Sequence, residues 1–446
     1  MNSWTLVTVE TIKAQTTAAL STGPFGSSIS SRHFQKTGVP VIRGSNLSED
    51  VGVRLIHDDL VFLSEEKARE FSRSRVGVGD LIFTCWGTVG QVGYISGHDP
   101  YGTYIISNKQ MKLTPDPSKT DSLFLYYLFS SPDIRRRIQR QGIGSSVPGF
   151  NLGQLRTIEF LLPPFPEQRA IAHILGTLDD KIELNQRMNA TLEAMARALF
   201  QSWFVDFDPV RARAERRQPE GMDAATAALF PDEFEETELG EVPRGWSVRA
   251  LPEAIAVNPP RRLQSGAVSP YLEMANMPTS SARALDWAPR EFTSGMRFTN
   301  GDVLVARITP CLENGKTAFV DFLADNQVGW GSTEYIVFRA KPPLPPTYAY
   351  FLARTEGFRM HAIQNMTGTS GRQRVPAEAF NSYLMVSPSP EVAERFGNLA
   401  ESTMRTLKRH DEESKTLAAL RDALLPKLLS GEMRVGEAEW VVEGTG

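Results

Sequence analysis

Two long stretches of the chain carry apolar residues at helical spacing. Between about Pro166 and Trp203 these residues recur mostly four and three positions apart, which predicts a helix with a coiled-coil seam. The seam residues are Ile171, Leu175, Leu178, Ile182, Leu192, Met195 and Leu199. Asn185 and Asn189 interrupt the seam, and buried polar residues of this kind fix the register and partner of a coiled coil. A second helix is predicted from about Pro390 to Leu429, with the apolar positions Val392, Phe396, Leu399, Leu417, Leu420 and Leu424.

Both predicted helices are too long for the core of one small domain. A helix of about 35 residues spans roughly 50 Å, whereas helices usually have ~11–12 residues. We expect the two helices to pair antiparallel, and the alternative is that each helix packs only on its own domain. Pro426 is expected to kink or end the second helix, because proline has no backbone N–H to donate.

The remaining sequence consists of β-branched and aromatic runs separated by Gly, Pro and Asn turns, which predicts short strands. Several segments also occur twice. Val78–Phe83 recurs as Asn300–Val305, Phe124–Leu128 as Tyr348–Leu352, Gly144–Pro148 as Gly368–Arg372, and Ile158–Pro164 as Tyr383–Pro388. The offset between matched positions stays between 222 and 225 residues, which indicates a tandem duplication.

These patterns predict an α+β protein in which two strand-rich globular domains, related by a pseudo-two-fold axis, are joined by two long antiparallel coiled-coil helices. The expected boundaries are a first strand-rich domain at residues 1–160, a long helix at 161–206, an acidic linker at 207–245, a second strand-rich domain at 246–388, a second long helix at 389–432 and a tail at 433–446.

The formal net charge of −4 argues at first sight against a nucleic-acid partner, but the distribution of charge matters more than its sum. Residues 220–241 hold eight acidic and no basic side chains, while basic residues cluster elsewhere, as in Ile134–Arg140. The chain has two cysteines, Cys85 and Cys311. No apolar run is long enough for a membrane span, and no signal peptide is evident, so we expect a cytoplasmic protein.

Motifs for catalysis are incomplete. Asn258–Arg261 resembles the Asn-Pro-Pro-aromatic loop of amino-methyltransferases, but its fourth residue is arginine rather than aromatic, so we interpret it as a turn. A metal-dependent nuclease site at Asp58, Asp59 and Glu65–Lys67 is the alternative to a helix capped by Ser64. The chain has no Gly-Lys-Ser/Thr phosphate loop, no glycine-rich cofactor loop and no histidines at zinc spacing. We therefore expect no metal site and no catalytic residue.

Both halves carry polar loops of a kind that can bind DNA. Arg and Lys can contact guanine, Asn and Gln adenine, and Ser and Thr phosphate. No single loop is specific, and the prediction depends on their recurrence at comparable places in the two halves. Arg372-Gln373-Arg374 is the strongest candidate, because two guanidinium groups flank an amide. The expected DNA contacts are Ser27, Ser28, Arg43, Asn46, Lys109, Gln110, Ser145, Ser146, Arg307, Asn314, Lys316, Ser332, Thr333, Thr369, Ser370, Arg372, Gln373 and Arg374.

Several of these segments are similar to a known family. Leu161–Ala172, Leu178–Asn185 and Leu199–Phe207 resemble the central conserved region of the specificity subunits of type I restriction–modification systems, the HsdS family. Leu424–Glu432 resembles their distal conserved region. The resemblance covers essentially the whole chain, although Ser387–Glu394 lacks the Gln-Arg pair found at the start of the first helix.

The resemblance implies a non-catalytic subunit with two target recognition domains, each reading one half of a split, asymmetric site in double-stranded DNA. It also implies two methyltransferase subunits, which hold S-adenosylmethionine and methylate adenine N6, and restriction subunits, which use ATP and Mg. The chain itself is expected to bind no cofactor. The paired helices would separate the two domains and dock the partners. The expected interface residues are Ile171, Leu175, Leu178, Ile182, Asn185, Asn189, Leu192, Leu199, Phe200, Trp203, Phe204, Phe396, Leu399, Leu417, Leu420 and Leu424.

Two other functions fit parts of the pattern. A coiled-coil DNA-binding regulator would act without enzyme partners. A single-chain restriction–methylation enzyme would need the cofactor and nuclease motifs that the sequence lacks.

Overall fold

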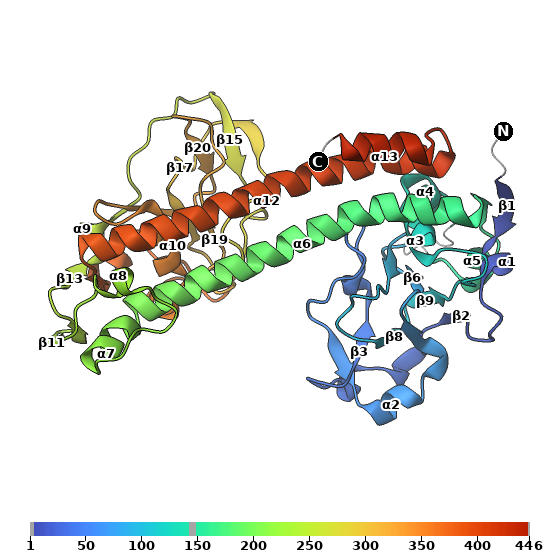
Figure 1. The fold of residues 1–446 in the computed structure, drawn as a ribbon, viewed down its shortest axis with the longest axis horizontal. Coiled ribbons are helices and arrows are strands. Elements are labelled where there is room, and N and C mark those ends of the chain that lie inside the picture. Colours follow the sequence, from blue (N-terminus) through green and yellow to red (C-terminus); the bar gives the residue numbers. More distant parts are fainter. Residues whose placement is uncertain (1–3, 142–148, 445–446) are drawn as a thin grey trace. The chain divides into compact units, whose positions relative to one another are not determined.

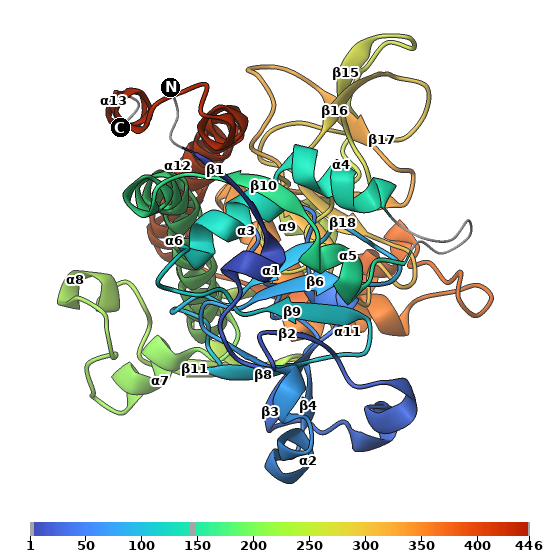
Figure 2. The ribbon, with the colours of Figure 1, turned by 90° about the vertical axis from the view of Figure 1, so that its right-hand side faces the viewer.

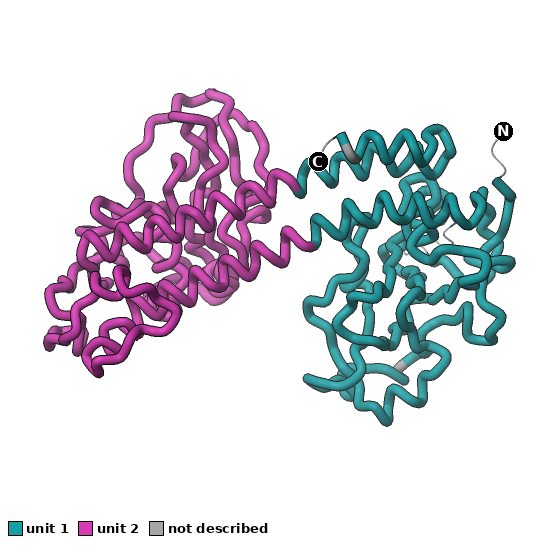
Figure 3. The backbone as a smooth tube through the Cα atoms, in the orientation of Figure 1, with its two compact units in different colours: residues 1–183, 414–446 teal, residues 184–413 magenta. Residues whose placement is uncertain are grey.

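The computed structural model describes residues 4–141 and 149–444, and the chain divides into two compact units (Figure 3). Unit 1 comprises Met1–Glu183 and Ser414–Gly446, and unit 2 comprises Leu184–Glu413. The long helices α6 (Phe165–Phe204) and α12 (Pro390–Ser430) each contribute one end to each unit (Figure 1). With 40 residues, α6 is about 60 Å long. No helix among the described residues is both long and apolar enough to cross a membrane.

Unit 1 contains two four-stranded sheets. The first is antiparallel throughout, in the order β2 (Leu20–Thr22), β9 (Gln110–Leu113), β6 (Leu81–Thr84) and β7 (Val92–Tyr94). Figure 2 shows β2, β9 and β6 side by side. The second has the order β4 (Val61–Leu63), β3 (Val39–Ile42), β8 (Thr103–Ile106) and β5 (Arg75–Gly77), with β3 and β8 parallel. Its helices before α6 are α1 (Val9–Ile12), α2 (Glu65–Arg69), α3 (Ser122–Ser130), α4 (Pro132–Arg140) and α5 (Leu152–Arg156).

Unit 2 repeats this topology strand for strand. Its antiparallel sheet has the order β14 (Ile255–Val257), β21 (Tyr335–Ala340), β18 (Val303–Ala306) and β19 (Thr317–Phe319). Its second sheet has the order β16 (Ala288–Glu291), β15 (Val268–Leu272), β20 (Gly329–Gly331) and β17 (Met296–Phe298), again with one parallel pair, β15 and β20. The helices are α9 (Leu251–Ala254), α10 (Pro346–Arg354) and α11 (Glu356–Gln364). The shared strand order confirms the tandem duplication and the predicted α+β class.

In each unit a two-stranded ribbon closes the repeat just before the long helix that follows it. β1 (Thr5–Thr8) pairs antiparallel with β10 (Glu159–Leu162) in unit 1, and β13 (Ser247–Ala250) pairs with β22 (Leu384–Ser387) in unit 2. Since β10 occupies residues 159–162, the helix predicted from residue 161 begins only at Phe165.

The segments around the long helices are more structured than the sequence indicated. Residues 207–245, expected as a linker, contain α7 (Asp208–Ala214), α8 (Ala224–Ala227) and a hairpin of β11 (Phe234–Thr237) and β12 (Gly240–Pro243). The tail contains α13 (Val435–Glu443). Helix α12 does not end at Pro426 but continues to Ser430, because a proline in the last turn removes only one backbone donor.

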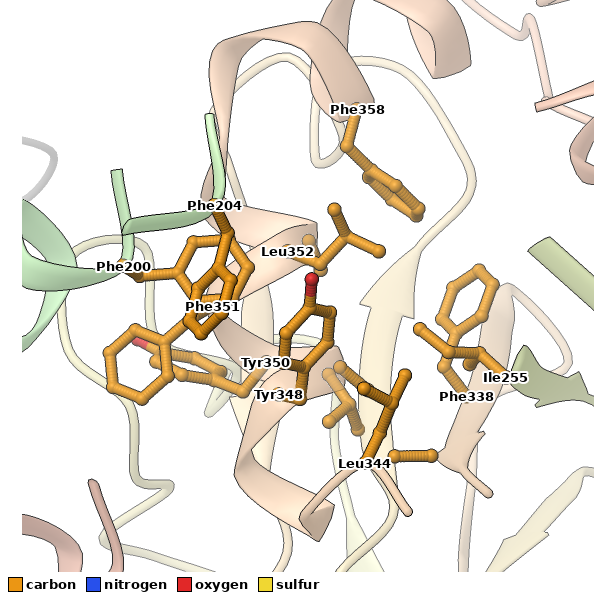
Figure 4. Packing of buried hydrophobic residues seen from close by; sticks show 14 of the residues in the cluster. Phe200, Phe204, Ile255, Phe338, Leu344, Tyr348, Tyr350, Phe351, Leu352 and Phe358 are labelled. Atoms are coloured by element: carbon orange, nitrogen blue, oxygen red, sulfur yellow. The ribbon is translucent and has the colours of Figure 1, made fainter. Parts of the chain in front are cut away.

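An aromatic cluster forms much of the core of unit 2, and Figure 4 shows Phe200, Phe204 and Tyr348 within it. The ring of Phe200 on α6 lies 4.9 Å from that of Tyr348 on α10 and 5.5 Å from that of Phe396 on α12, measured between centroids. Phe204 packs against the same two rings. Burying a side chain of this size contributes roughly 1.5–3 kcal/mol. The segment Leu199–Phe207 therefore owes much of its apolar character to the core of its own unit.

Polar contacts between α6 and α12 show that the helices run antiparallel. In unit 2, Asn185 Nδ2 donates to Glu413 Oε2 (2.8 Å) and Asn189 Nδ2 to Asp411 Oδ1 (2.9 Å). In unit 1, the buried Arg421 Nη1 donates to Asp179 Oδ1 (2.7 Å), whose other oxygen accepts from the Tyr127 hydroxyl (2.6 Å). Within unit 2, positions along α12 therefore fall as positions along α6 rise, as an antiparallel pair requires.

Two residues of the predicted seams lie outside them. Met195 is 63% exposed and Leu399 is 38% exposed. The buried neighbour on α6 is instead Glu193, whose carboxylate accepts from the Tyr350 hydroxyl (2.5 Å) and from Ala282 N (2.8 Å). The buried residues of α12 include Val392, Phe396, Ala400, Met404 and Leu407, whose helical spacing turns Leu399 toward solvent.

Replacing Arg421 should destabilise unit 1 strongly. Arg421→Leu leaves the carboxylate of Asp179 buried without its cation, and we expect the free energy of unfolding to fall by about 3–5 kcal/mol. The double variant with Asp179→Leu should recover most of this loss, because both charges are then gone. Chemical denaturation measures the effect, with Arg405→Leu on the exposed face of α12 as the control. An unchanged midpoint for Arg421→Leu would show that the ion pair does not stabilise the unit.

Candidate nucleic-acid interface

Four loops of unit 1 meet at one edge of its antiparallel sheet. Because neighbouring strands run in opposite directions, β2 and β6 end where β9 and β7 begin, with Thr22 opposite Met111 and Thr84 opposite Gln110. The loop after β3 joins them, since Ser107 N donates to Ile42 O (2.9 Å). We call residues 23–28, 43–46, 85–91 and 107–109 together the first edge.

Backbone contacts hold these loops in place. Gly23 N donates to Gln110 O (3.0 Å), and a Cβ atom at Gly23 would lie 1.8 Å from the carbonyl oxygen of Ser107, so only glycine fits there. Cys85 N donates to Lys109 O (2.7 Å), and Trp86 forms a β-bridge with Gly149. The predicted contacts Ser145 and Ser146 fall in 142–148, outside the described residues.

Two of the predicted contacts, Asn46 on this edge and Gln110 at the start of β9, are used inside the protein. Asn46 is fully buried; its Nδ2 donates to Ile56 O (3.0 Å) and Asp58 O (3.1 Å), and its Oδ1 accepts from Arg43 N (3.0 Å). Gln110 is also fully buried, with its amide against the Ser107 hydroxyl. Both side chains shape loops rather than face a ligand, which corrects the prediction that they contact bases.

Lys109, Ser28 and Arg43, also predicted on the first edge, lie nearer solvent. Lys109 and Ser28 are exposed, and Ser27 belongs to the short 3₁₀ turn Gly26–Ser28. Arg43 is half-buried, and its Nη2 donates to Asp59 O (2.6 Å). Lys109 therefore presents its charge freely, whereas Arg43 is partly committed to the protein.

Sequence reasoning missed two aromatic side chains on this edge. Phe25 is 78% exposed and Trp86 is 52% exposed. Their positions just after β2 and β6 could have drawn attention to them, because a strand's apolar pattern ends where the loop begins. The sequence prediction considered only the polar side chains of these loops, so it did not include the two aromatic rings.

Three loops of unit 2 meet at the corresponding edge of its antiparallel sheet. Ala306 at the end of β18 lies opposite Tyr335, and Arg307 N donates to Glu334 O (2.9 Å). Ala306 N donates to Lys316 O (3.0 Å), and Ile308 forms a bridge with Arg374. We call residues 307–316, 332–334 and 367–374 together the second edge.

On the second edge Arg374 is paired within the protein. Its Nε donates to both carboxylate oxygens of Glu334, at 2.8 and 3.0 Å, and these contacts raise the pKa of Arg374. Lys316 Nζ donates to Met274 O (2.5 Å). Arg307, Ser332 and Gln373 are half-buried. The predicted contacts that remain open to solvent are Asn314, Thr333, Thr369, Ser370 and Arg372.

The two edges differ in charge. The first edge contains Arg43 and Lys109 and no acidic residue. The second contains four basic residues and two acidic ones, Glu313 and Glu334. In a chain with a net charge of −4, a surface with cations and no carboxylates is suited to a polyanion.

The segments that resembled catalytic motifs have structural partners. Asn258 pairs with β21, its N donating to Val337 O (2.7 Å) and its Oδ1 accepting from Val337 N (2.9 Å), while Arg261 binds the buried Asp302 (2.9 Å). Ser64 caps α2, accepting from Lys67 N (3.1 Å). Among the described residues no three His, Cys, Asp or Glu side chains are grouped so that they could hold a metal ion.

Known proteins resemble this chain along most of its length. Residues 26–194 match the family described as the type I restriction modification DNA specificity domain. The HindI specificity subunit of Haemophilus influenzae is 23% identical, covering 90% of this chain and 96% of its own length. The MjaIX specificity subunit of Methanocaldococcus jannaschii is 21% identical, over 84% and 82% respectively. The crystal structure of an S subunit from M. genitalium shares the fold, with a TM-score of 0.55, 13% identity and 96% coverage of both chains.

The two cysteines should differ in reactivity, because each lies on one edge. Burial raises the pKa of the Cys85 thiol to about 12, so at pH 8 only about one molecule in ten thousand carries the reactive thiolate. Cys311 is half-buried. We expect iodoacetamide to modify Cys311 and spare Cys85 in the native protein, as measured by peptide mass spectrometry, and to modify both in urea. Rapid native alkylation of Cys85 would show that the loop after β6 is open.

Proposed function

Because this chain belongs to the specificity subunits of type I restriction–modification systems, we propose that units 1 and 2 are target recognition domains that read the two halves of a split site in double-stranded DNA. The chain supplies sequence specificity to its complex. The observation that carries the proposal is the convergence of the polar loops on one sheet edge in each unit. Loops gathered on a rigid sheet can hold several donors and acceptors against one short run of base pairs.

The two half-sites should have different sequences. The first edge presents Lys109 beside two exposed aromatic rings, whereas the second presents Arg372 among hydroxyl and amide side chains. A guanidinium contacts guanine well, whereas the segment matched in sequence to Gly368–Arg372, Gly144–Pro148, contains no arginine. The duplicated scaffold therefore carries two different reading surfaces, which fits an asymmetric target.

The chain assembles with the other subunits of its system and binds DNA. In this proposal two methyltransferase subunits hold S-adenosylmethionine and methylate adenine N6, and restriction subunits use ATP and Mg. The specificity subunit itself carries no catalytic residue and holds no cofactor. The absence of a Gly-Lys-Ser/Thr loop and of a glycine-rich cofactor loop from the sequence supports this division of labour.

An apolar stripe on α6 supports the docking of a methyltransferase subunit. Phe200, Trp203 and Phe204, expected at subunit interfaces, are buried in the core of unit 2. Leu184, Met188 and Met195 are instead exposed, and at 3.6 residues per turn they lie within about 40° of one another on the helix. Exposed apolar residues on one helix face are typical of a surface that packs against a partner helix.

Methylation sequencing tests the function directly. Cells that express this chain with the methyltransferase subunit of its system should gain a methyladenine motif in two parts separated by a fixed gap, and cells without this chain should not. Exchanging residues of one unit for those of a relative should change one part of the motif only. A soluble complex that adds no new motif would favour a DNA-binding regulator without enzyme partners.

Charges on the α6 stripe should release the methyltransferase subunit. We expect Leu184→Glu with Met188→Glu to abolish co-purification, because carboxylates would be desolvated in an apolar interface. The melting temperature of the isolated chain should stay nearly unchanged, since both side chains are exposed. Leu285→Glu, at an equally exposed leucine away from the helix, is the matched control. A complex that survives the double substitution would place the docking surface elsewhere.

A further inference from the structure

We propose that Phe25 and Trp86 stack on bases of the half-site read by unit 1, so that the first edge recognises DNA partly by opening a base step. The inference rests on the proposed function, because it assumes that the first edge faces DNA. It adds a mode of DNA recognition, aromatic stacking on bases, that the second edge lacks. Residues 307–316, 332–334 and 367–374 contain no aromatic side chain.

The exposed aromatic residues are concentrated on this edge. The chain has 24 phenylalanines and 7 tryptophans, all of them among the described residues, and only Phe25, Trp86 and Trp440 are exposed. Two of these three stand on the first edge. Single exposed apolar residues are ordinary. Two large rings on an edge that also carries Lys109 and no carboxylate indicate a ligand with both apolar and anionic groups, as nucleic acid has.

Trp86 is held in a defined orientation. Its backbone pairs with Gly149, and Phe150 N donates to Cys85 O (2.8 Å). A Cβ atom at Gly149 would lie 2.6 Å from the indole ring, so the ring rests directly on the glycine backbone. About half of the side chain remains open to solvent. A ring fixed on one side and open on the other loses little conformational entropy when a base stacks on it.

Phe25 is presented by a short, restrained loop. Pro24 precedes it, and Gly26 follows it with a φ of 62°, a conformation that favours glycine. Gly23 is pinned against the carbonyl of Ser107. The loop therefore turns sharply at both sides of Phe25 and leaves the ring at its tip.

The spacing of the two strands that precede the rings suits a short run of bases. The rings follow β2 and β6, which are separated by β9 alone. Two strand spacings amount to roughly 10 Å, about the height of three stacked base pairs. Aromatic side chains that insert beside a base step partly unstack it, and loss of such a stacking ring weakens binding by roughly ten-fold or more.

The test uses the full-length chain in complex with its methyltransferase subunits. The probes are duplexes with the two-part motif found by methylation sequencing and a single abasic nucleotide moved through each half. We expect Phe25→Ala and Trp86→Ala each to weaken binding to the intact duplex about ten-fold, and Trp86→Phe to retain most of it. At one or two positions in one half of the motif, the abasic nucleotide should weaken binding by the wild-type complex. It should hardly affect binding by the alanine variant, because that variant already lacks the ring on which the base would stack.

Controls separate stacking from other causes. Trp440→Ala removes a tryptophan that is 77% exposed on α13 and should leave binding unchanged. Lys109→Ala should reduce the slope of log affinity against log salt concentration by about the value expected for one phosphate contact. Phe25→Ala should leave that slope unchanged. Unaltered binding by both alanine variants, or weakened binding that couples to no abasic position, would overturn the stacking inference. A wild-type complex that does not distinguish the motif from a scrambled duplex would instead overturn the proposed function.

Discussion

Each unit depends on burying one end of both long helices against its own sheets. The core of unit 1 combines Ile171 and Leu175 from α6 with Leu424 and Leu428 from α12, and the core of unit 2 combines Phe200 with Phe396 in the same manner. Unit 1 is therefore completed by residues 414–446, which are distant in sequence, whereas unit 2 is the continuous segment Leu184–Glu413. The last segment of the chain belongs to the same compact unit as the first, and the duplicated halves cannot be separated at the linker without exposing apolar surface.

Polar groups inside these cores set the register that apolar packing alone leaves loose. Asp179 is buried between Tyr127 and Arg421, and burial raises its pKa even though both partners donate to it. In unit 2 the buried carboxylate is Glu193, which accepts from Tyr350, the residue aligned with Tyr126 rather than with Tyr127. Both carboxylates lie on α6, so the two repeats are not equivalent around the helix pair. An unpaired charge at either place would be costly, which discourages any other alignment of the helices.

The sheets supply a common frame, and the loops on their edges supply the differences. Strand order and the single parallel pair are the same in both units, so loops far apart in sequence arrive at equivalent places. Their chemistry differs, with aromatic rings and Lys109 in one unit and Arg372 with a paired Arg374 and Glu334 in the other. Function can change at an edge of this kind without altering the core, because edge residues contribute little to burial.

Local periodicity was enough to predict the two helices from the sequence, because a helix repeats every 3.6 residues. The near-constant offset between matched segments was enough to predict the duplication, and the alternation of strand and helix patterns predicted the α+β class. The polar loops were also evident as loops. Which of their side chains face outward was decided only in three dimensions: Asn46 turns inward because the carbonyls of Ile56 and Asp58 reach it, while Lys109 finds no such partner among the described residues. Phe25 and Trp86 are of residue types that are usually buried in a core. They are exposed because strands β2 and β6 end just before them. Side-chain direction and burial depend on segments distant in sequence, and no local pattern contains them.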